Sequence, residues 1–373
     1  MILSDVCEFI VECPHSTAPD EGEGYPLIRT PNVGKGRLDL NGVHRVSESV
    51  YKQRIQRGAP RANDLIFARE APAGNVALVQ ENQTVCLGQR TVLIRPNVQK
   101  VNPQYLVYYL LSPKPQYELL GTANGATVAH VNLPAIRNLK IELPEKSVQD
   151  KIGTILVTYD DLIENNQKQI KLLEEAAQRL YKEWFVDLRF PGHENTKIVD
   201  GVPEGWSRGL LKELISVNYG KDHKKAPDDG NIPVYGSGGL MRKCNKSLFS
   251  GEAVLIPRKG SLNNIMYVDE TFWTVDTMFY ATMKQPHTAV FVYFFVKAFD
   301  MYSMNIGAAV PSMTTKILDA MDVVIPDKET LEKFDKREKV YFNKIKTLHG
   351  QNERLKTARD LLLPKLMSGE VKV

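Results

Sequence analysis

Residues 147–190 decide the fold, and they read SVQDKIGTILVTYDDLIENNQKQIKLLEEAAQRLYKEWFVDLRF. The stretch contains no proline and a single glycine, Gly153. From Tyr159 onward, apolar residues together with Asn166 recur in alternating steps of four and three, which is heptad spacing. The positions in this stripe are Ile152, Tyr159, Ile163, Asn166, Ile170, Leu173, Ala177, Leu180 and Trp184. The pattern predicts a long helix whose apolar stripe is too narrow to be stable without a partner.

The C-terminal segment carries a second stripe of the same kind. Its positions are Phe334, Tyr341, Ile345, Leu348, Asn352, Leu355, Arg359, Leu362 and Leu366. Roughly 40 helical residues at 1.5 Å each span about 60 Å. We expect the two helices to pair antiparallel, with Asn166 and Asn352 fixing the register. The alternative is that both are ordinary helices of one globular core.

Eight residues are predicted to form the buried seam of this helix pair. They are Ile163, Ile170, Leu173, Leu180, Ile345, Leu348, Leu355 and Leu362.

The segments ahead of the two helices are weak copies of each other. Residues 143–144 (LP) are echoed by 325–326 (IP), and 125–128 (GATV) by 307–310 (GAAV), at a separation of about 182 residues. Further upstream, three more pairs match: 64–69 (DLIFAR) with 253–258 (AVLIPR), 25–28 (YPLI) with 232–235 (IPVY), and 3–6 (LSDV) with 211–214 (LKEL). The sequence therefore predicts one globular module used twice, each copy followed by a long helix.

Each module is predicted to mix α and β structure, because short β-rich runs alternate with Gly, Pro and Asn. The runs are 65–68, 76–79, 91–94 and 139–143, then 254–256, 265–268, 277–282 and 323–325, with short helices near 105–111 and 289–299. The predicted class is α+β: two tandem α/β modules at 1–145 and 196–327, with long helices at 146–195 and 328–373. An antiparallel coiled coil would relate the modules by a pseudo-two-fold axis, the arrangement with which dimers read two DNA half-sites.

Composition narrows the class of protein. The chain has 373 residues, 43% hydrophobic and 25% charged, with a net charge of +4 that permits nucleic-acid binding without requiring it. No apolar run is long enough for a membrane span, and residues 1–5 do not resemble a secretion signal. The four cysteines form no Cys-x-x-Cys pair, which argues against a zinc site or a disulfide framework. We expect a cytoplasmic protein.

Catalytic motifs are missing from the sequence. Residues 102–105 (NPQY) only approach the Asn-Pro-Pro-Tyr turn that holds a flipped adenine, and no glycine-rich cofactor loop precedes them. Asn102 is better explained as a helix N-cap, with Pro103 in the first turn. There is no phosphate-binding loop, and the histidines lack metal-ligand spacing. We expect no catalytic residue, metal or cofactor on this chain.

Basic residues in the module loops are the candidate DNA contacts. A glycine-bounded turn holds Lys35 and Arg37, where a backbone could approach phosphates. Arg69 and Arg258 each follow a predicted strand at equivalent places in the two modules. The other candidates lie in basic runs and are Arg54, Arg57, Lys221, Lys224, Lys225, Arg242 and Lys259. The loops at 125–132 and 307–314 also occupy equivalent places. For each basic residue, a solvated charge or a structural ion pair is the competing interpretation.

With its order of module, helix, module, helix, the chain resembles the specificity subunits of Type I restriction–modification systems. The resemblance rests on 143–144 (LP) followed by Gln149-x-x-Ile152, on 202–206 (VPEGW) opening the second half, and on the segments around Arg69 and Arg258. The chain departs from the family pattern in two places. The first half has no Pro-x-Gly-Trp motif, and the segment that leaves the second module (326–328, PDK) lacks the glutamine found after the first module.

The resemblance implies a subunit that binds a bipartite double-stranded DNA target, one half per module. It implies two modification subunits, which carry S-adenosylmethionine and methylate adenine, as partners on the long helices. Restriction subunits that use ATP and Mg are further implied partners. Two other hypotheses stay open: a self-sufficient DNA methyltransferase, and a coiled-coil scaffold with no role on nucleic acid.

Overall fold

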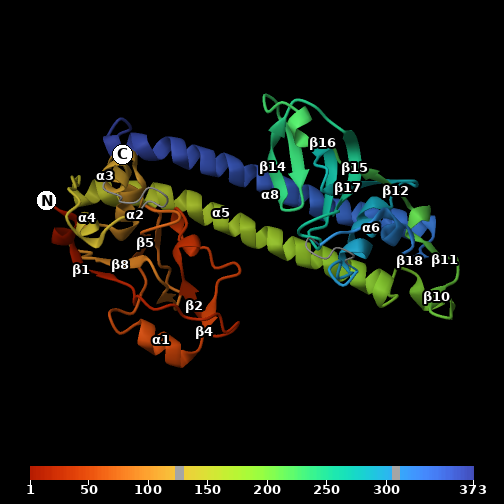
Figure 1. Ribbon diagram of the computed structural model, residues 1–373, viewed down its shortest axis with the longest axis horizontal. Helices are drawn as coiled ribbons and strands as arrows, with labels where there is room; N and C mark the ends of the chain where they lie inside the picture. The colour runs from red at the N-terminus through yellow and green to blue at the C-terminus, as the bar shows by residue number, and fades with distance from the viewer. Residues whose placement is uncertain (122–129, 305–310) are drawn as a thin grey trace. The chain divides into compact units, whose positions relative to one another are not determined.

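The computed structural model describes residues 1–121, 130–304 and 311–373, apart from the side chain of Lys225. The repeat segments 125–128 and 307–310 therefore lie outside the described residues. The chain divides into two compact units (Figure 1). The first unit is Met1–Lys168 with Leu348–Val373, and the second unit is Gln169–Thr347. Each unit combines one globular module with parts of both long helices.

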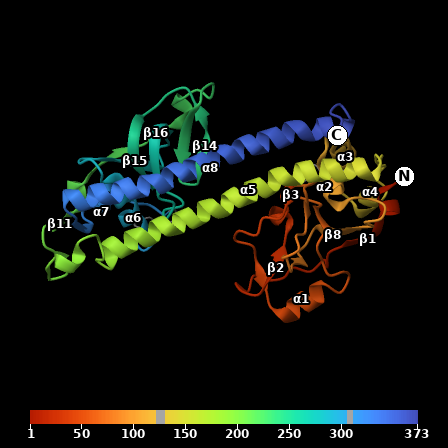
Figure 2. The same ribbon diagram turned by 180° about the vertical axis from the view of Figure 1, so that it is seen from behind.

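The long helices are α5 (Lys146–Tyr181) and α8 (Lys328–Ser368). The α-helical part of the first ends at Tyr181, well before the end of the predicted 146–195 spacer, and a π-helical turn at Lys182–Val186 follows. Within the first unit the helices run antiparallel, as Figure 2 shows. There the amide of Asn166 donates to Asn352 (2.9 Å), which confirms the predicted polar pair in the seam.

The predicted seam residues lie on the inner sides of the helices. In the first unit Ile163 and Leu348 are buried, and Leu355 and Leu362 are half-buried. In the second unit, Ile170 and Ile345 are buried, and Leu173 and Leu180 are half-buried. The predicted α+β class with paired long helices is confirmed.

In the first unit a five-stranded sheet has the order β1-β8-β5-β6-β3, and a smaller sheet has the order β4-β2-β7. The strands are β1 (Cys7–Glu12), β2 (Tyr25–Ile28), β3 (Gly36–Arg37), β4 (Arg45–Val46), β5 (Leu65–Ala68), β6 (Val76–Leu78), β7 (Cys86–Leu87) and β8 (Thr91–Pro96). The helices are α1 (Glu48–Arg54), α2 (Pro103–Leu111), α3 (Pro113–Gly121) and α4 (Leu133–Arg137). One core joins the larger sheet, α2, the start of α5 and the end of α8.

In the second unit the main sheet has six strands in the order β12-β17-β15-β16-β13-β14, and the pairs β11-β18 and β10-β9 lie outside it. The strands are β9 (Ile198–Val199), β10 (Val202–Pro203), β11 (Ser207–Leu210), β12 (Ile215–Tyr219), β13 (Ile232–Gly236), β14 (Gly239–Cys244), β15 (Phe249–Pro257), β16 (Met266–Thr274), β17 (Met278–Met283) and β18 (Asp322–Ile325). The helices are α6 (Ala289–Lys297) and α7 (Thr315–Asp319). Its core again includes both long helices.

Backbone hydrogen bonds confirm the repeat in detail. Leu3 donates to Leu139 in the first unit (2.9 Å), and Leu211 donates to Met321 in the second (2.8 Å). The strands β1-β8-β5-β6 and β12-β17-β15-β16 follow the same order. Parallel pairing also recurs, between β2 and β7 and between β13 and β16. The two modules are therefore one fold used twice.

Two local predictions have different outcomes. The side chain of Asn102 accepts from the amide of Tyr105 (3.0 Å), so Asn102 is the N-cap of α2 as expected. The strand predicted at 139–143 is wrong, because this stretch makes only one isolated bridge, between Ile2 and Lys140. None of the described helices is long and apolar enough to cross a membrane.

Candidate nucleic-acid interface

Arg54 is a structural residue, which corrects its prediction as a DNA contact. It lies at the end of α1 and is only 4% exposed. Its guanidinium donates to the backbone carbonyls of Pro14 (3.4 Å), Ser16 (2.5 Å) and Leu87 (3.5 Å). A buried guanidinium that satisfies backbone carbonyls cannot reach a duplex without disrupting the module.

The turn at Gly34–Arg37 packs against α2 and α5. Gly36 has φ +92°, and a Cβ there would lie 2.6 Å from Asp160 and 3.2 Å from Tyr108, so this position needs glycine. Next to it, Arg37 forms an ion pair with Asp161 on α5. The guanidinium of Arg37 therefore makes an internal contact, and the expected approach of this turn to phosphates stays a prediction. Of the two basic residues in this turn, Lys35 is exposed and Arg37 is half-buried.

Arg69 and Arg258 occupy equivalent backbone positions but differ in their side chains. The carbonyl of Arg69 accepts from Val131 (3.0 Å), and that of Arg258 accepts from Met313 (2.9 Å). The guanidinium of Arg69 is nearly buried and is paired with Glu12 (2.9 Å). That of Arg258 is half-exposed. Only the second arginine is placed to bind an external anion.

In the second unit, aromatic and basic side chains gather where three neighbouring strands begin or end. Tyr219 is the last residue of β12, and it pairs with Phe279 near the start of β17. On the other side of β17, Phe279 pairs with Ile256, near the end of β15. Arg258 lies over the Tyr219 ring, 5.5 Å from its centroid, and donates to the carbonyl of Asp276 (3.1 Å). We call this end of the sheet the basic edge.

Three more groups extend the basic edge. Lys259 and Lys221 are exposed. Tyr302, 44% exposed, donates its hydroxyl to the carbonyl of Gly260 (3.3 Å). The side chains of Lys221, Arg258 and Lys259 form no ion pair with a carboxylate anywhere in the described ranges. Unpaired cations beside exposed rings suit a phosphate backbone and unstacked bases.

The loop after β12 is held in place by Arg242, whose assignment as a DNA contact stays a prediction. Its guanidinium donates to the carbonyls of His223 and Ala226 (2.6 Å for the latter). Lys224 remains exposed on this loop. The side chain of Lys225 lies outside the described part of the chain, and its assignment stays a prediction.

The equivalent end of the first unit's sheet is a small crevice of about 400 Å³. It is lined by Cys13, His15, Arg69, Glu70, Gln89, Arg90 and His130. Here the cations are paired internally, since Arg90 contacts Glu70 at 2.6 Å and His130 contacts the same carboxylate. Arg57, which is exposed and donates to the carbonyl of Cys13 (3.3 Å), lies beside this crevice. The two modules thus present different chemistry at the same place.

Sequence reasoning missed Tyr219 and Tyr302. These residues are 54% and 44% exposed, and they lie beside Arg258 and Gly260 of the basic edge, respectively. A signal was available for Tyr219, because it ends a β-rich run immediately before the basic loop at 221–225. Among the described residues, no group of three or more His, Cys, Asp or Glu is placed to hold a metal ion.

Comparison with known proteins defines the class. The family model "Type I restriction modification DNA specificity domain" matches residues 1–175 and 203–357. The matches cover most of the chain and take in each module with a stretch of the long helix that follows it. The chain belongs to this family.

Individual relatives agree. The specificity subunit of the type I restriction enzyme MjaIX from Methanocaldococcus jannaschii is 26% identical over 89% of this chain and 83% of its own length. The specificity subunit of the type I restriction enzyme HindI from Haemophilus influenzae is 23% identical over 84% of this chain and 87% of its own length. The crystal structure of the type I S subunit from M. genitalium has the same fold, with a TM-score of 0.63, 17% identity, and coverage of 98% of this chain and 95% of that one.

Proposed function

We propose that this chain is the sequence-reading subunit of a Type I restriction–modification complex, with each module recognising one half of a bipartite DNA target. The observation that carries the proposal is the duplication of one fold, with each copy matched by the DNA specificity domain model. The two copies carry different side chains at the equivalent end of their sheets. Different side chains on one scaffold are what two unlike half-sites require.

The basic edge is the proposed contact surface of the second module. Lysine and arginine there would neutralise phosphates, and the exposed tyrosines would contact sugars or bases. In the first module the crevice around Arg69 would act through its polar side chains, Gln89 and His15 among them. Because its cations are already paired, we expect this module to contribute less to the salt dependence of binding.

The chemistry would be supplied by partners. We propose that modification subunits, carrying S-adenosylmethionine, bind the long helices and methylate adenine, and that restriction subunits join where they are present. Asn102 belongs to the segment that comes nearest to a methyltransferase motif. Its side-chain amide is occupied by internal hydrogen bonds, because it caps α2 and donates to Asp150 (2.7 Å). This use supports a non-catalytic role for the chain.

Co-expression with the neighbouring modification subunit is expected to produce adenine methylation in a split motif with a fixed gap. Single-molecule sequencing of methylated random DNA reads both half-sites at once. The modification subunit expressed alone is the control and should give no motif. A contiguous motif, methylation by this chain alone, or no complex with the modification subunit would contradict the proposal.

The double substitution R258A/K259A is expected to weaken DNA binding by the complex and to flatten its salt dependence. The slope of log K against log salt should fall by about one for each phosphate that the variant no longer neutralises. K284A is the matched control, since Lys284 is exposed just beyond the opposite end of β17 and donates to the carbonyl of Lys212. An unchanged slope in R258A/K259A, or an equal weakening in K284A, would remove the basic edge from the interface.

A further inference from the structure

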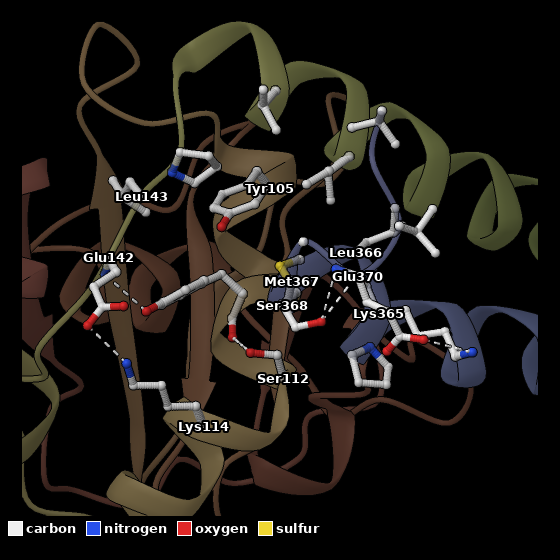
Figure 3. Close-up of a pocket in the computed structure, with 18 of the residues that line it drawn as sticks. Tyr105, Ser112, Lys114, Glu142, Leu143, Lys365, Leu366, Met367, Ser368 and Glu370 are labelled. Atoms are coloured by element: carbon white, nitrogen blue, oxygen red, sulfur yellow. Dashed lines mark hydrogen bonds and ion pairs between the residues drawn. The ribbon is translucent and has the colours of Figure 1, made fainter.

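Exposed apolar side chains mark a binding surface most clearly where the charged groups around them are unpaired. In the first unit, a cavity of about 1050 Å³ opens beside α2 and the end of α8, but the charged groups labelled around it pair with each other (Figure 3). Lys114 contacts Glu142 (3.0 Å), and Lys365 contacts Glu370 (3.3 Å). The β13–β14 hairpin of the second unit is different, because its exposed apolar side chains lie beside unpaired cations.

The hairpin places two neighbouring apolar residues of β14 in solvent. Leu240 is 60% exposed, and Met241 is 54% exposed. Neighbouring side chains of a regular strand point to opposite faces, but the register shifts here. Tyr235 of β13 pairs with Leu240, and the pairing then skips Met241, which is therefore the extra residue of a β-bulge. Because β14 is also the edge strand of its sheet, both side chains are open to a ligand.

The turn of the hairpin leaves room for Met241. Residues 237–238 form the turn, and Gly236 is the last residue of β13 before it. A Cβ on Gly236 would lie 2.5 Å from the sulfur of Met241, so glycine at this position lets that side chain lie across the hairpin. The Met241 side chain is thereby placed at the turn end of the hairpin while it stays exposed.

One side of the turn contacts the loop that follows Arg258. The side-chain amide of Asn264 donates to the carbonyl of Ser237 (2.9 Å). A Cβ on Gly260 would lie 2.8 Å from the hydroxyl oxygen of Ser237, so the turn and the loop touch at this glycine. The carbonyl of Gly260 accepts the hydroxyl of Tyr302, which belongs to the basic edge.

The other side of the hairpin is hydrogen-bonded to the segment that precedes β17. The amide of Val275 donates to the carbonyl of Tyr235 (3.0 Å), and the next residue, Asp276, provides the carbonyl to which Arg258 donates. Lys221 lies beside the same segment, because its amide donates to the carbonyl of the residue before Val275 (2.9 Å). The exposed apolar residues of β14 therefore adjoin the basic edge.

The first module differs at the equivalent connection. Strand β2 pairs parallel with β7 and antiparallel with β4, as β13 pairs with β16 and with β14. Residues 29–44 connect β2 to β4, and the turn within them contacts α2 and α5 through Gly36 and Arg37. The first module thus uses this connection for its own packing, whereas the second module presents Leu240 and Met241 to solvent.

The apolar character of these side chains restricts what the hairpin can read on DNA. Leucine and methionine offer no hydrogen-bond donor to base edges, and the apolar group that base pairs present is the thymine methyl, in the major groove. A two-stranded ribbon fits the major groove, about 12 Å wide, but not the minor groove, about 6 Å wide. Apolar wedges that separate base pairs enter from the minor groove, so the hairpin favours contact with methyl groups over insertion.

We propose that the β13–β14 hairpin lies in the major groove of the half-site read by the second module, and that Leu240 and Met241 recognise thymine through its methyl group. This inference rests on the proposed function and names two residues that determine specificity. Each methyl group removed from water by such a contact favours thymine by about fourfold. Lys243, which is exposed on β14 and forms no ion pair within the described ranges, would meet phosphate beside the groove.

Methylation mapping separates specificity from affinity. In the complex with the modification subunit, L240A/M241A is expected to lower the preference for thymine by about fourfold or more at one or two positions of one half-site. The other half-site and the gap should not change. I198A/V199A is the matched control, because it removes two neighbouring exposed apolar side chains from β9, and it should give the parent motif. R258A/K259A should weaken binding without changing the motif.

Uracil in the DNA tests the same contact without altering the protein. Deoxyuridine pairs as thymidine does but lacks the methyl group. At a position relaxed by L240A/M241A, it should weaken binding by the parent complex about fourfold or more and leave binding by L240A/M241A unchanged, as measured by fluorescence anisotropy on the mapped duplex.

The inference is overturned if the parent complex gives a split motif and L240A/M241A keeps every base preference in it. It is also overturned if I198A/V199A relaxes the motif equally, or if uracil weakens both complexes alike. A parent complex that gives no split motif overturns the proposed function itself, and this inference with it.

Discussion

E338L is expected to stabilise the second unit by several kcal/mol at pH 8 and by much less at pH 5. Glu338 lies in α8 with 0% exposure, and neither of its carboxylate oxygens has a hydrogen-bond partner in the described structure. Burial raises the pKa of this carboxyl from 4.5 to about 8. The corresponding residue of the first long helix is the fully buried Leu156, so leucine suits the position.

The direction of the pH effect follows from that raised pKa. Below pH 4.5 the carboxyl is protonated in both states and Glu338 carries no ionisation penalty. As the pH rises from 4.5 toward 8, the unfolded chain releases this proton and the folded chain retains it, so the free energy of unfolding falls. One pKa unit corresponds to roughly 1.4 kcal/mol, which puts the whole decrease on the order of 4 kcal/mol.

Tryptophan fluorescence isolates this effect. Trp184, Trp206 and Trp273, the three tryptophans of the chain, all belong to the second unit, so urea unfolding followed by their emission reports on that unit. E338Q should remove the pH dependence between pH 5 and 8 as E338L does. E353Q, at an exposed glutamate of the same helix, should retain it. Parallel pH profiles for the parent chain and E338L would show that Glu338 does not titrate as inferred.

R359A is expected to destabilise the first unit by about 3–5 kcal/mol. Arg359 of α8 forms an ion pair with Asp160 of α5, whose side chain is only 3% exposed. The same carboxylate accepts the hydroxyl of Tyr108 (2.5 Å). Removing the guanidinium leaves a buried anion with a single neutral donor, and this uncompensated charge is the source of the cost.

Replacing both residues of the ion pair separates the cost of the unpaired buried charge from the effect on packing. In D160L/R359M both charges are replaced by apolar side chains, and part of the stability should return, less the cost of leaving the buried Tyr108 hydroxyl without its acceptor. The second unit supports this expectation, since the repeat places Phe342 and Ala177 at the equivalent positions. Far-ultraviolet circular dichroism should show the destabilisation in R359A, while tryptophan emission, which reports on the second unit, changes little. A double variant as unstable as R359A would mean that the ion pair is not the cause.

The sequence alone determined the features that depend on local spacing. Heptad steps around Asn166 and Asn352 predicted the two long helices and their polar pair, because a helical stripe repeats every few residues. Asn102 followed by Pro103 predicted a capped helix for a similar reason. The repeat predicted a module used twice, and through it the equivalence of Arg69 and Arg258.

Only the tertiary structure decided which charges are free. Arg37 meets a carboxylate 124 residues away, and Arg359 meets one 199 residues away. The guanidinium of Arg54 is buried and donates to backbone carbonyls, whereas that of Arg258 is half-exposed and lies over Tyr219. Nothing in the local sequence distinguishes these arginines. A charged side chain is assigned to structure or to a ligand by the partners that folding brings within hydrogen-bond distance, and those partners are remote in the chain.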